Sequence, residues 1–174
     1  MLAGIARQNG FIGEDIEAAC QHWVRRFGAG PFFVVRNLRL ASFRYQGVES
    51  DPELSIALGN LGELQIELIQ QHNDAPSPYR DFAQSKRAGL HHISAWVNDY
   101  DAELARQLAL GAEPDCEGQL SDGMRFAYYG STAVDGSALE IADLGPNNEL
   151  AAGFELVRQA HIAWDGEEPV RFLG

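Results

Sequence analysis

Hydrophobic and polar residues alternate along several short stretches of the chain, and apolar residues recur at helical spacing between these stretches. In the N-terminal part, Asp15 stands where a helix N-cap is expected and Gly28 where that helix should end. The predicted elements are a strand at about 5–12, a helix from Ile16 to Phe27, and strands from Phe32 to about Tyr45, at 53–59 and at 62–70. This part is therefore predicted to fold as strand, helix and three strands.

The second half of the chain repeats this order. Gln8 precedes the helix-starting Asp15 by seven residues, and His92 precedes Asp99, the start of the second helix, by seven as well. The predicted elements are a strand at 90–97, a helix at 99–110 and strands near 113–117, 123–130 and 136–143. The sequence thus predicts a duplicated module.

The pattern divides the chain into two modules, 1–71 and 89–145, a linker at 72–88 and a C-terminal extension at 146–174. We expect one α+β domain, in which two βαβββ modules with mixed four-stranded sheets curl into a shared cup, plus a C-terminal helix. One side of that helix carries Leu150, Phe154, Val157, His161 and Trp164. This stripe predicts a homodimer, although packing on the same chain would cover it equally well.

The strands are informative because successive side chains point to opposite faces, and the face under a helix must be apolar. In strand 62–70 the apolar row Leu64, Ile66 and Leu68 turns Glu67 to the free face. The same division turns His92 and Glu140 to the free face of their strands.

The division also applies to strand 53–59. It places Leu54, Ile56 and Leu58 under the helix, so that Glu53 and its same-side neighbours face the cup.

Four polar residues are therefore candidate metal ligands: Gln8, Glu67, His92 and Glu140. Each module supplies one of them from its first strand and a glutamate from its last strand. An imidazole, two carboxylates and an amide oxygen suit an exchangeable divalent ion such as Zn²⁺, Co²⁺, Ni²⁺, Mn²⁺ or Fe²⁺. His22, His72 and His161 are interpreted as structural, although His161 could touch substrate if the last helix folds over the cup mouth.

Composition narrows the possible partners. The net charge of −12 disfavours nucleic acid and anionic membranes. No apolar run approaches the ~20 residues that span a bilayer, and the start of the chain lacks a signal-peptide pattern, so we expect a cytoplasmic protein.

Cys20 and Cys116 lie in different modules, which argues against a thiolate metal site or a disulfide. Aromatic residues near the cup favour a small molecule with an apolar or aromatic acyl group.

Three segments resemble the vicinal oxygen chelate superfamily, which includes glyoxalase I, methylmalonyl-CoA epimerase and extradiol dioxygenases. Gly89–Asp99 (GLHHISAWVND) is similar to the corresponding segment of the epimerases, and 64–69 (LQIELI) and 138–141 (ALEI) resemble the strands that carry ligands. The resemblance covers roughly 5–143 and implies paired βαβββ modules around a metal ion.

The resemblance leaves the reaction open. The ligand types at Gln8 and Glu67 look more like those of a eukaryotic-type glyoxalase I, because epimerases usually have histidine at the first position and often glutamine at the second. In epimerases a catalytic glutamate lies on the strand that matches 53–59, where Ser55 occupies the corresponding position and Glu53 lies one same-face step away. Glu53 is therefore a candidate base by resemblance.

The favoured function is a metal-dependent isomerase, epimerase or lyase that acts on a small carbonyl or thioester substrate through an enolate. Glu140 and either Glu67 or Glu53 would exchange the α-proton. A lactoylglutathione lyase of the glyoxalase type is an alternative, and a non-catalytic protein that binds small molecules, as in the drug-resistance branch, is another. A ring-cleaving dioxygenase is disfavoured because its iron needs two histidines.

Overall fold

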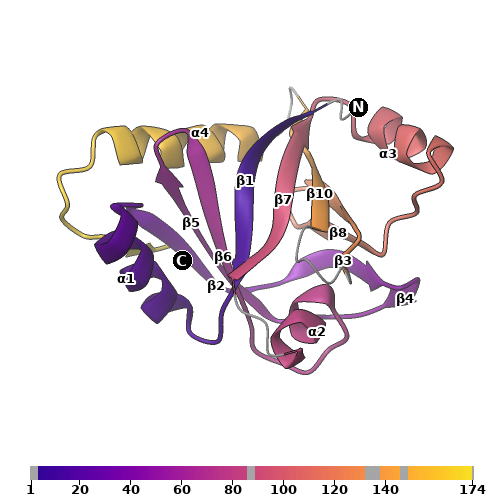
Figure 1. The fold of residues 1–174 in the computed structure, drawn as a ribbon, viewed down its shortest axis with the longest axis horizontal. Coiled ribbons are helices and arrows are strands. Elements are labelled where there is room, and N and C mark those ends of the chain that lie inside the picture. The colour runs from indigo at the N-terminus through magenta and orange to yellow at the C-terminus, as the bar shows by residue number, and fades with distance from the viewer. Residues whose placement is uncertain (1–3, 86–88, 132–137, 146–148, 174) are drawn as a thin grey trace.

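The computed structural model describes residues 4–85, 89–131, 138–145 and 149–173, which form a mixed sheet flanked by helices (Figure 1). The first half contains β1 (Ile5–Ile12), α1 (Ile16–Phe27), β2 (Phe32–Leu38), β3 (Leu40–Tyr45), β4 (Val48–Glu49), β5 (Leu54–Leu61) and β6 (Leu64–Gln71). After α2 (Pro78–Gln84), the second half contains β7 (Gly89–Val97), α3 (Tyr100–Ala109), β8 (Cys116–Leu120), β9 (Arg125–Tyr129) and β10 (Ala138–Asp143). The chain continues with α4 (Glu149–Ile162) and β11 (Val170–Phe172).

The strand order shows the duplication. The sheet runs β11-β2-β5-β6-β1-β7-β10-β9-β8-β3-β4, so each half places its first strand beside its last. The first and last strands are parallel in both halves, β1 with β6 and β7 with β10. Antiparallel pairing of β1 with β7 joins the two halves into one sheet. The predicted α+β fold with paired βαβββ modules is confirmed; the domain boundaries stay a prediction, and linker residues 86–88 lie outside the described residues.

The run from Phe32 to Tyr45 is not one strand, as the sequence predicted, but two. β2 pairs with β5 of its own half, whereas β3 pairs with β8 of the other half. The strand is interrupted near Asn37, which adopts a left-handed backbone with φ of 52° that asparagine tolerates well. Because β2 and β3 are consecutive in sequence but lie toward opposite ends of the sheet, this crossing bends the sheet into a cup.

The two module helices begin and pack as their sequences predict. The Asp15 side chain accepts a hydrogen bond from Ala18 N, and the Asp99 side chain accepts one from Ala102 N, so both aspartates are N-caps. α1 and α3 lie on the outer side of the sheet, one on each half (Figure 1). Under α1 the core contains Ala57, Ile66 and Leu68, and beside Tyr100 of α3 it contains Val97, Ala127 and Ile141.

The predicted orientation of strand β5 is wrong. Leu58 is the cross-strand partner of Glu67, and Ile56 is the partner of Ile69, so the large apolar side chains of β5 share the face of Glu67. Ala57 points the other way and is fully buried under α1. The cup interior is itself apolar, and the residue that β5 places under α1 is the small Ala57. The row of large apolar residues in β5 therefore lies on the face toward the cup and not on the face under α1.

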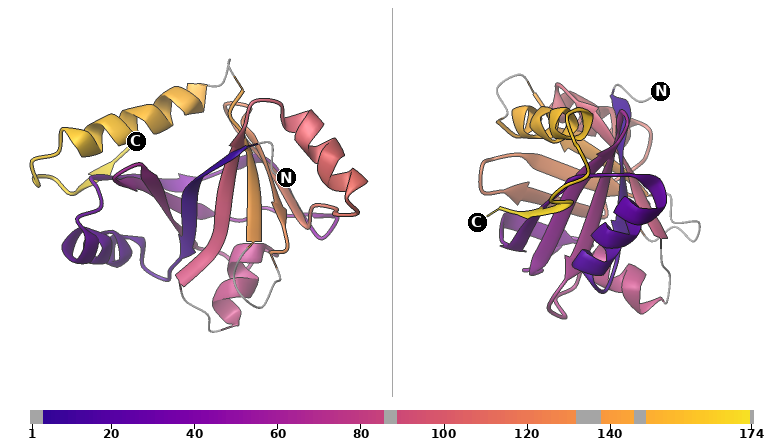
Figure 2. Two further views of the ribbon diagram at one scale, coloured as in Figure 1. Left: turned by 45° about the horizontal axis from the view of Figure 1, so that its top comes forward. Right: turned by 90° about the vertical axis from the view of Figure 1, so that its left-hand side faces the viewer.

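The C-terminal segment packs on its own chain. Phe154 and Val157 of α4 are buried, and the Phe154 ring lies 4.8 Å from that of Trp96 on β7. His161 has the structural position predicted for it, because its ring nitrogens lie 2.6 Å from Gly30 O and 3.0 Å from Gly62 N. β11, which the sequence did not predict, pairs in parallel with β2. Figure 2 shows α4 lying across one end of the cup strands.

Several expectations about the extension and the partners remain. The Leu150 side chain lies outside the described residues. Leu156 and Ile162 of α4 are exposed, and homodimerisation and a cytoplasmic location stay predictions. Over the part of the chain that the structure describes, no helix combines the length and the apolar character that a membrane span requires.

Candidate metal centre

Strand register brings the predicted ligands onto one face. In one row across the sheet, Gly10 of β1 pairs with Glu67 on one side and with His92 on the other. In the neighbouring row, two residues along each strand, Ser94 lies between Gln8 and Glu140. Because side chains two residues apart share a face, all four predicted ligands point into the cup.

The register also shows the twofold relation between the modules. A half-turn about an axis between β1 and β7 exchanges Gln8 with His92 and Glu67 with Glu140. Each ligand thus has a counterpart at the equivalent position of the other module, as the seven-residue offset in the sequence predicted.

Three of the four side chains converge at one point. His92 Nε2 lies 3.1 Å from Glu67 Oε2 and 3.6 Å from Glu140 Oε2. Nitrogen and oxygen atoms of the three residues lie within 4.8 Å of one another. His92 is fully buried, and the side chains of Glu67 and Glu140 are only 12 % and 8 % exposed. Two carboxylates and an imidazole this close together could hold a divalent cation.

The fourth predicted ligand is buried in the neighbouring row. Gln8 Nε2 donates a 2.7 Å hydrogen bond to Gln65 Oε1. This bond occupies the amide nitrogen of Gln8, so the amide oxygen is the atom left to serve a cation.

Glu53, the base expected by resemblance, does not join the cluster. Glu53 immediately precedes β5, and its place in the alternation puts it on the face of β5 that points away from the cup. Its carboxylate forms an ion pair of 2.7 Å with Arg39. Its side chain is 40 % exposed. The reversed orientation of β5 explains this error.

Gly10 is a position beside the candidate ligands that the sequence analysis missed. The His92 ring lies over this glycine so closely that a Cβ at Gly10 would be 1.9 Å from Cε1 and 2.2 Å from Nε2. A glycine two residues after Gln8, in an otherwise regular strand, was the available signal, since glycine in a strand often marks a close approach.

The electrostatics of the cluster favour a bound cation. Burial is the largest influence on His92 and lowers its pKa, but the carboxylates of Glu140 and Glu67 outweigh burial, so the pKa is raised. Burial raises the pKa of Glu140, and Glu67 adds to this while His92 opposes it. Within the described residues, Glu67 Oε2 and His92 Nε2 have no hydrogen-bond partner. A carboxylate oxygen and an imidazole nitrogen without hydrogen-bond partners, beside the second buried carboxylate of Glu140, fit a divalent ion, whose charge would offset that of the carboxylates.

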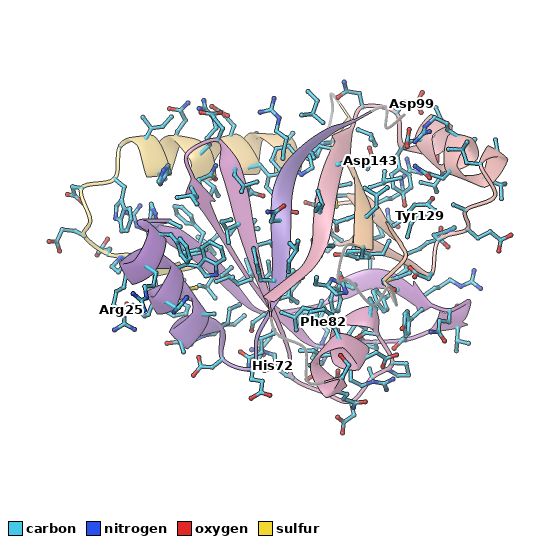
Figure 3. The ribbon with its side chains drawn as sticks, viewed as in Figure 1. Arg25, His72, Phe82, Asp99, Tyr129 and Asp143 are labelled. Atoms are coloured by element: carbon cyan, nitrogen blue, oxygen red, sulfur yellow. The ribbon has the colours of Figure 1, made fainter. Side chains whose placement is uncertain are left out.

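An unpredicted second histidine lies beside the cluster. Gly10 pairs with His92 and Phe11 pairs with Leu90, so His91 is the extra residue of a β-bulge. The His91 side chain is buried, and its Nδ1 lies 3.0 Å from His92 Nδ1. Phe82 lies on the side of α2 that faces the strands (Figure 3), and its ring meets that of His91 with centroids 5.2 Å apart.

An apolar pocket of about 220 Å³ opens beside Glu67 and Glu140. The described residues that line it include no lysine or arginine. Apolar side chains from both modules and from α4 form most of its wall: Val35, Leu38, Leu40, Leu54, Ile56, Leu58, Ile69, Met124, Phe126 and Phe154. The pocket therefore suits a small apolar group next to the carboxylates.

Replacing Phe154 with alanine should open this pocket and destabilise the fold. Truncation of a buried phenylalanine costs about 3–5 kcal/mol, and Phe154 is 6 % exposed. Leu156→Ala, on the same helix but 70 % exposed, should change stability by less than about 0.5 kcal/mol. Denaturant unfolding of the two variants measures the difference; equal stabilities would show that α4 is not docked over the cup.

Comparison with known proteins agrees with the fold. None of the curated proteins compared with the chain matches it. Methylmalonyl-CoA epimerase from Mycobacterium tuberculosis is 19 % identical, with a TM-score of 0.59 over 87 % of this chain and 93 % of that one. A hypothetical protein from Bacillus halodurans C-125 is 19 % identical, with a TM-score of 0.58 over 81 % and 94 %. A variant of Streptomyces coelicolor methylmalonyl-CoA epimerase, in complex with 2-nitronate-propionyl-CoA, is 17 % identical, with a TM-score of 0.54 over 85 % and 98 %.

A sequence profile of one family matches residues 7–128, which is more than half of the chain and includes Gln8, Glu67 and His92. The paired modules, their shared cup and this match lead to one assignment. The chain belongs to the Glyoxalase/Bleomycin resistance protein/Dioxygenase superfamily.

Proposed function

We propose that this protein is a divalent-metal-dependent isomerase, epimerase or lyase that acts on a small carbonyl or thioester substrate through an enolate. The observation that carries the proposal is the buried cluster of Glu67, His92 and Glu140, contributed by both modules. Gln8, Glu67, His92 and Glu140 would hold the ion. When bound, a divalent cation supplies Lewis-acid stabilisation of the negative charge that develops on a carbonyl oxygen when the neighbouring proton leaves.

The two glutamates are the groups that would move the proton. A carboxylate oxygen of Glu67 and one of Glu140 lie near the same imidazole nitrogen, and they come from opposite halves of the cup. Epimerisation needs a proton to leave one face of a planar intermediate and return to the other, so two opposed carboxylates suit it. Each would contribute about 10²–10⁴-fold as a general acid or base.

The pocket selects the substrate and keeps water away. Its apolar wall meets Glu67 and Glu140 directly, so a small acyl group in the pocket would place its acidic carbon beside the carboxylates. The epimerases with a similar fold include a complex with 2-nitronate-propionyl-CoA. We therefore favour the thioester of a small branched acyl group.

Two alternatives have specific support. Glutamine at position 8 and glutamate at position 67 resemble the ligand types of a glyoxalase, which would act on a glutathione hemithioacetal. The family name also includes bleomycin resistance proteins, so a binding protein without catalysis is the alternative from another class. The buried carboxylate cluster favours an enzyme over a binding protein.

Metal analysis and solvent deuterium exchange test the proposal together. Protein purified without chelator should contain a stoichiometric divalent ion and should introduce deuterium at the α-carbon of methylmalonyl-CoA. Removal of the ion by a chelator should abolish the exchange, and return of the ion should restore it. A faster reaction with the hemithioacetal of methylglyoxal and glutathione would favour the glyoxalase alternative. Absence of both the ion and exchange would favour the binding protein.

A further inference from the structure

We propose that His91 is a positioning residue that accepts a hydrogen bond from Nδ1 of His92 and so leaves Nε2 of His92 free to bind a divalent ion together with the two glutamates. This inference rests on the proposed function, because it assigns His91 a role in holding a ligand of the metal centre. It concerns which nitrogen of a neutral His92 ring carries the proton.

The β-bulge is what makes the contact possible. In a regular strand, consecutive side chains point to opposite faces, so His91 and His92 could not meet. Gly10 and Phe11 of β1 pair with His92 and Leu90 of β7, so β7 has one extra residue at the bulge. The alternation of side chains between the two faces is broken there. The two rings consequently lie nearly perpendicular, with centroids 5.3 Å apart and their Nδ1 atoms 3.0 Å apart.

The direction of the hydrogen bond follows from the surroundings of His92. An N···N contact of 3.0 Å is a hydrogen bond only if one Nδ1 carries a hydrogen and the other does not. His92 Nε2 faces Glu67 and Glu140, and a ligand nitrogen must be unprotonated. In a metal-bound state the proton of the neutral His92 ring would therefore be on Nδ1, and His91 Nδ1 would accept the hydrogen bond.

Aromatic rings hold His91 in this place. The ring of Phe82 meets it edge to face at 5.2 Å, and those of Tyr128 and Tyr79 lie at 5.7 and 5.8 Å. His91 is 1 % exposed, so water competes little for the hydrogen bond. An acceptor fixed on the far nitrogen of a metal-binding histidine orients the ring and raises its basicity, and loss of such a partner typically costs about 10–100-fold in metal affinity.

Two substitutions at this position separate hydrogen bonding from packing. His91→Phe keeps an aromatic ring but removes the acceptor, and His91→Asn keeps an acceptor oxygen near the position of Nδ1. We expect the phenylalanine variant to bind Zn²⁺ or Co²⁺ about 10–100-fold more weakly, measured by competition with a chelator, and the asparagine variant to recover most of that loss. Thermal unfolding without metal serves as the packing control. Wild-type affinity in a folded phenylalanine variant would overturn the inference.

The wild-type protein provides a test that needs no variant. In ¹⁵N-histidine-labelled, Zn²⁺-loaded protein, we expect a scalar coupling between the two Nδ1 nuclei, with the proton bonded to His92. Absence of the coupling, or a proton on His91 Nδ1, would overturn the inference even if metal binds. A wild-type protein that shows the coupling but binds no metal would contradict the proposed function alone.

Discussion

Glu67→Gln and Glu140→Gln should each reduce the rate of metal-dependent deuterium exchange by about 10²–10⁴-fold. Glutamine keeps the size of the side chain but removes the charge and replaces one basic oxygen with an NH2 group. Both carboxylates lie within 3.6 Å of His92 Nε2 and are almost fully buried, so no solvent base can replace them there. The exchange rate should be measured alongside the metal content of each variant, because loss of the ion and loss of the base then become distinguishable.

Glu53→Gln provides the contrast. The sequence placed this residue in the cup, whereas the structure pairs its carboxylate with Arg39 at a partly exposed position. The variant should therefore keep the wild-type exchange rate and lose at most about 1 kcal/mol of stability, as is typical of an exposed ion pair. A large loss of exchange in Glu53→Gln, with full activity in the other two variants, would support Glu53 as the base that the resemblance implied and remove the two cup glutamates from the reaction.

The two modules and the candidate ligands could be predicted because both depend on regular spacings of residues along the sequence. Side chains alternate with a period of two in a strand, so the apolar rows of β6, β7 and β10 identify the free face of each strand without coordinates. The equal offsets of Gln8 from Asp15 and of His92 from Asp99 set the register of one module against the other. Those offsets persist in the structure as matched positions across β1 and β7.

The errors occur where a strand has two apolar environments or changes its partner. Both faces of β5 are buried, one in the cup and one under α1, so its apolar row did not reveal which face was which. The β-rich run from Phe32 to Tyr45 likewise does not show that the chain leaves its partner β5 and pairs next with β8. Local sequence patterns report burial, but the pairing of distant strands depends on tertiary contacts.

The contacts of His92 could not be predicted from the sequence for a related reason. The bulge that exposes His91 to His92 arises from the pairing of β1 with β7, and no residue of the His91-His92 doublet indicates it. Gly10 gave a signal only as a glycine within a strand, which has several possible causes. Both features depend on how β1 and β7 pair beside the fully buried imidazole of His92.

Gly10→Ala should displace His92 and disable the metal centre. A Cβ at position 10 would lie 1.9–2.4 Å from three atoms of the imidazole ring, far inside van der Waals contact. The ring cannot simply turn away, because it is fully buried between its neighbours. Overpacking of this kind costs about 1–3 kcal/mol, and loss of the ligand should weaken metal binding by about 100-fold or more, since disturbance of a ligand's partner alone costs about 10–100-fold.

Gly13→Ala is the matched control for this substitution. It adds the same methyl group just beyond the end of β1, where the nearest neighbour of the new Cβ would be Ala19 Cβ at 3.9 Å, an ordinary contact. Stability should change by less than about 0.5 kcal/mol, and metal affinity should not change. Calorimetric titration with Zn²⁺ and denaturant unfolding distinguish the two variants. If Gly10→Ala binds metal as tightly as the control, the imidazole over Gly10 is not a ligand, and the cluster of Glu67, His92 and Glu140 cannot be the metal centre.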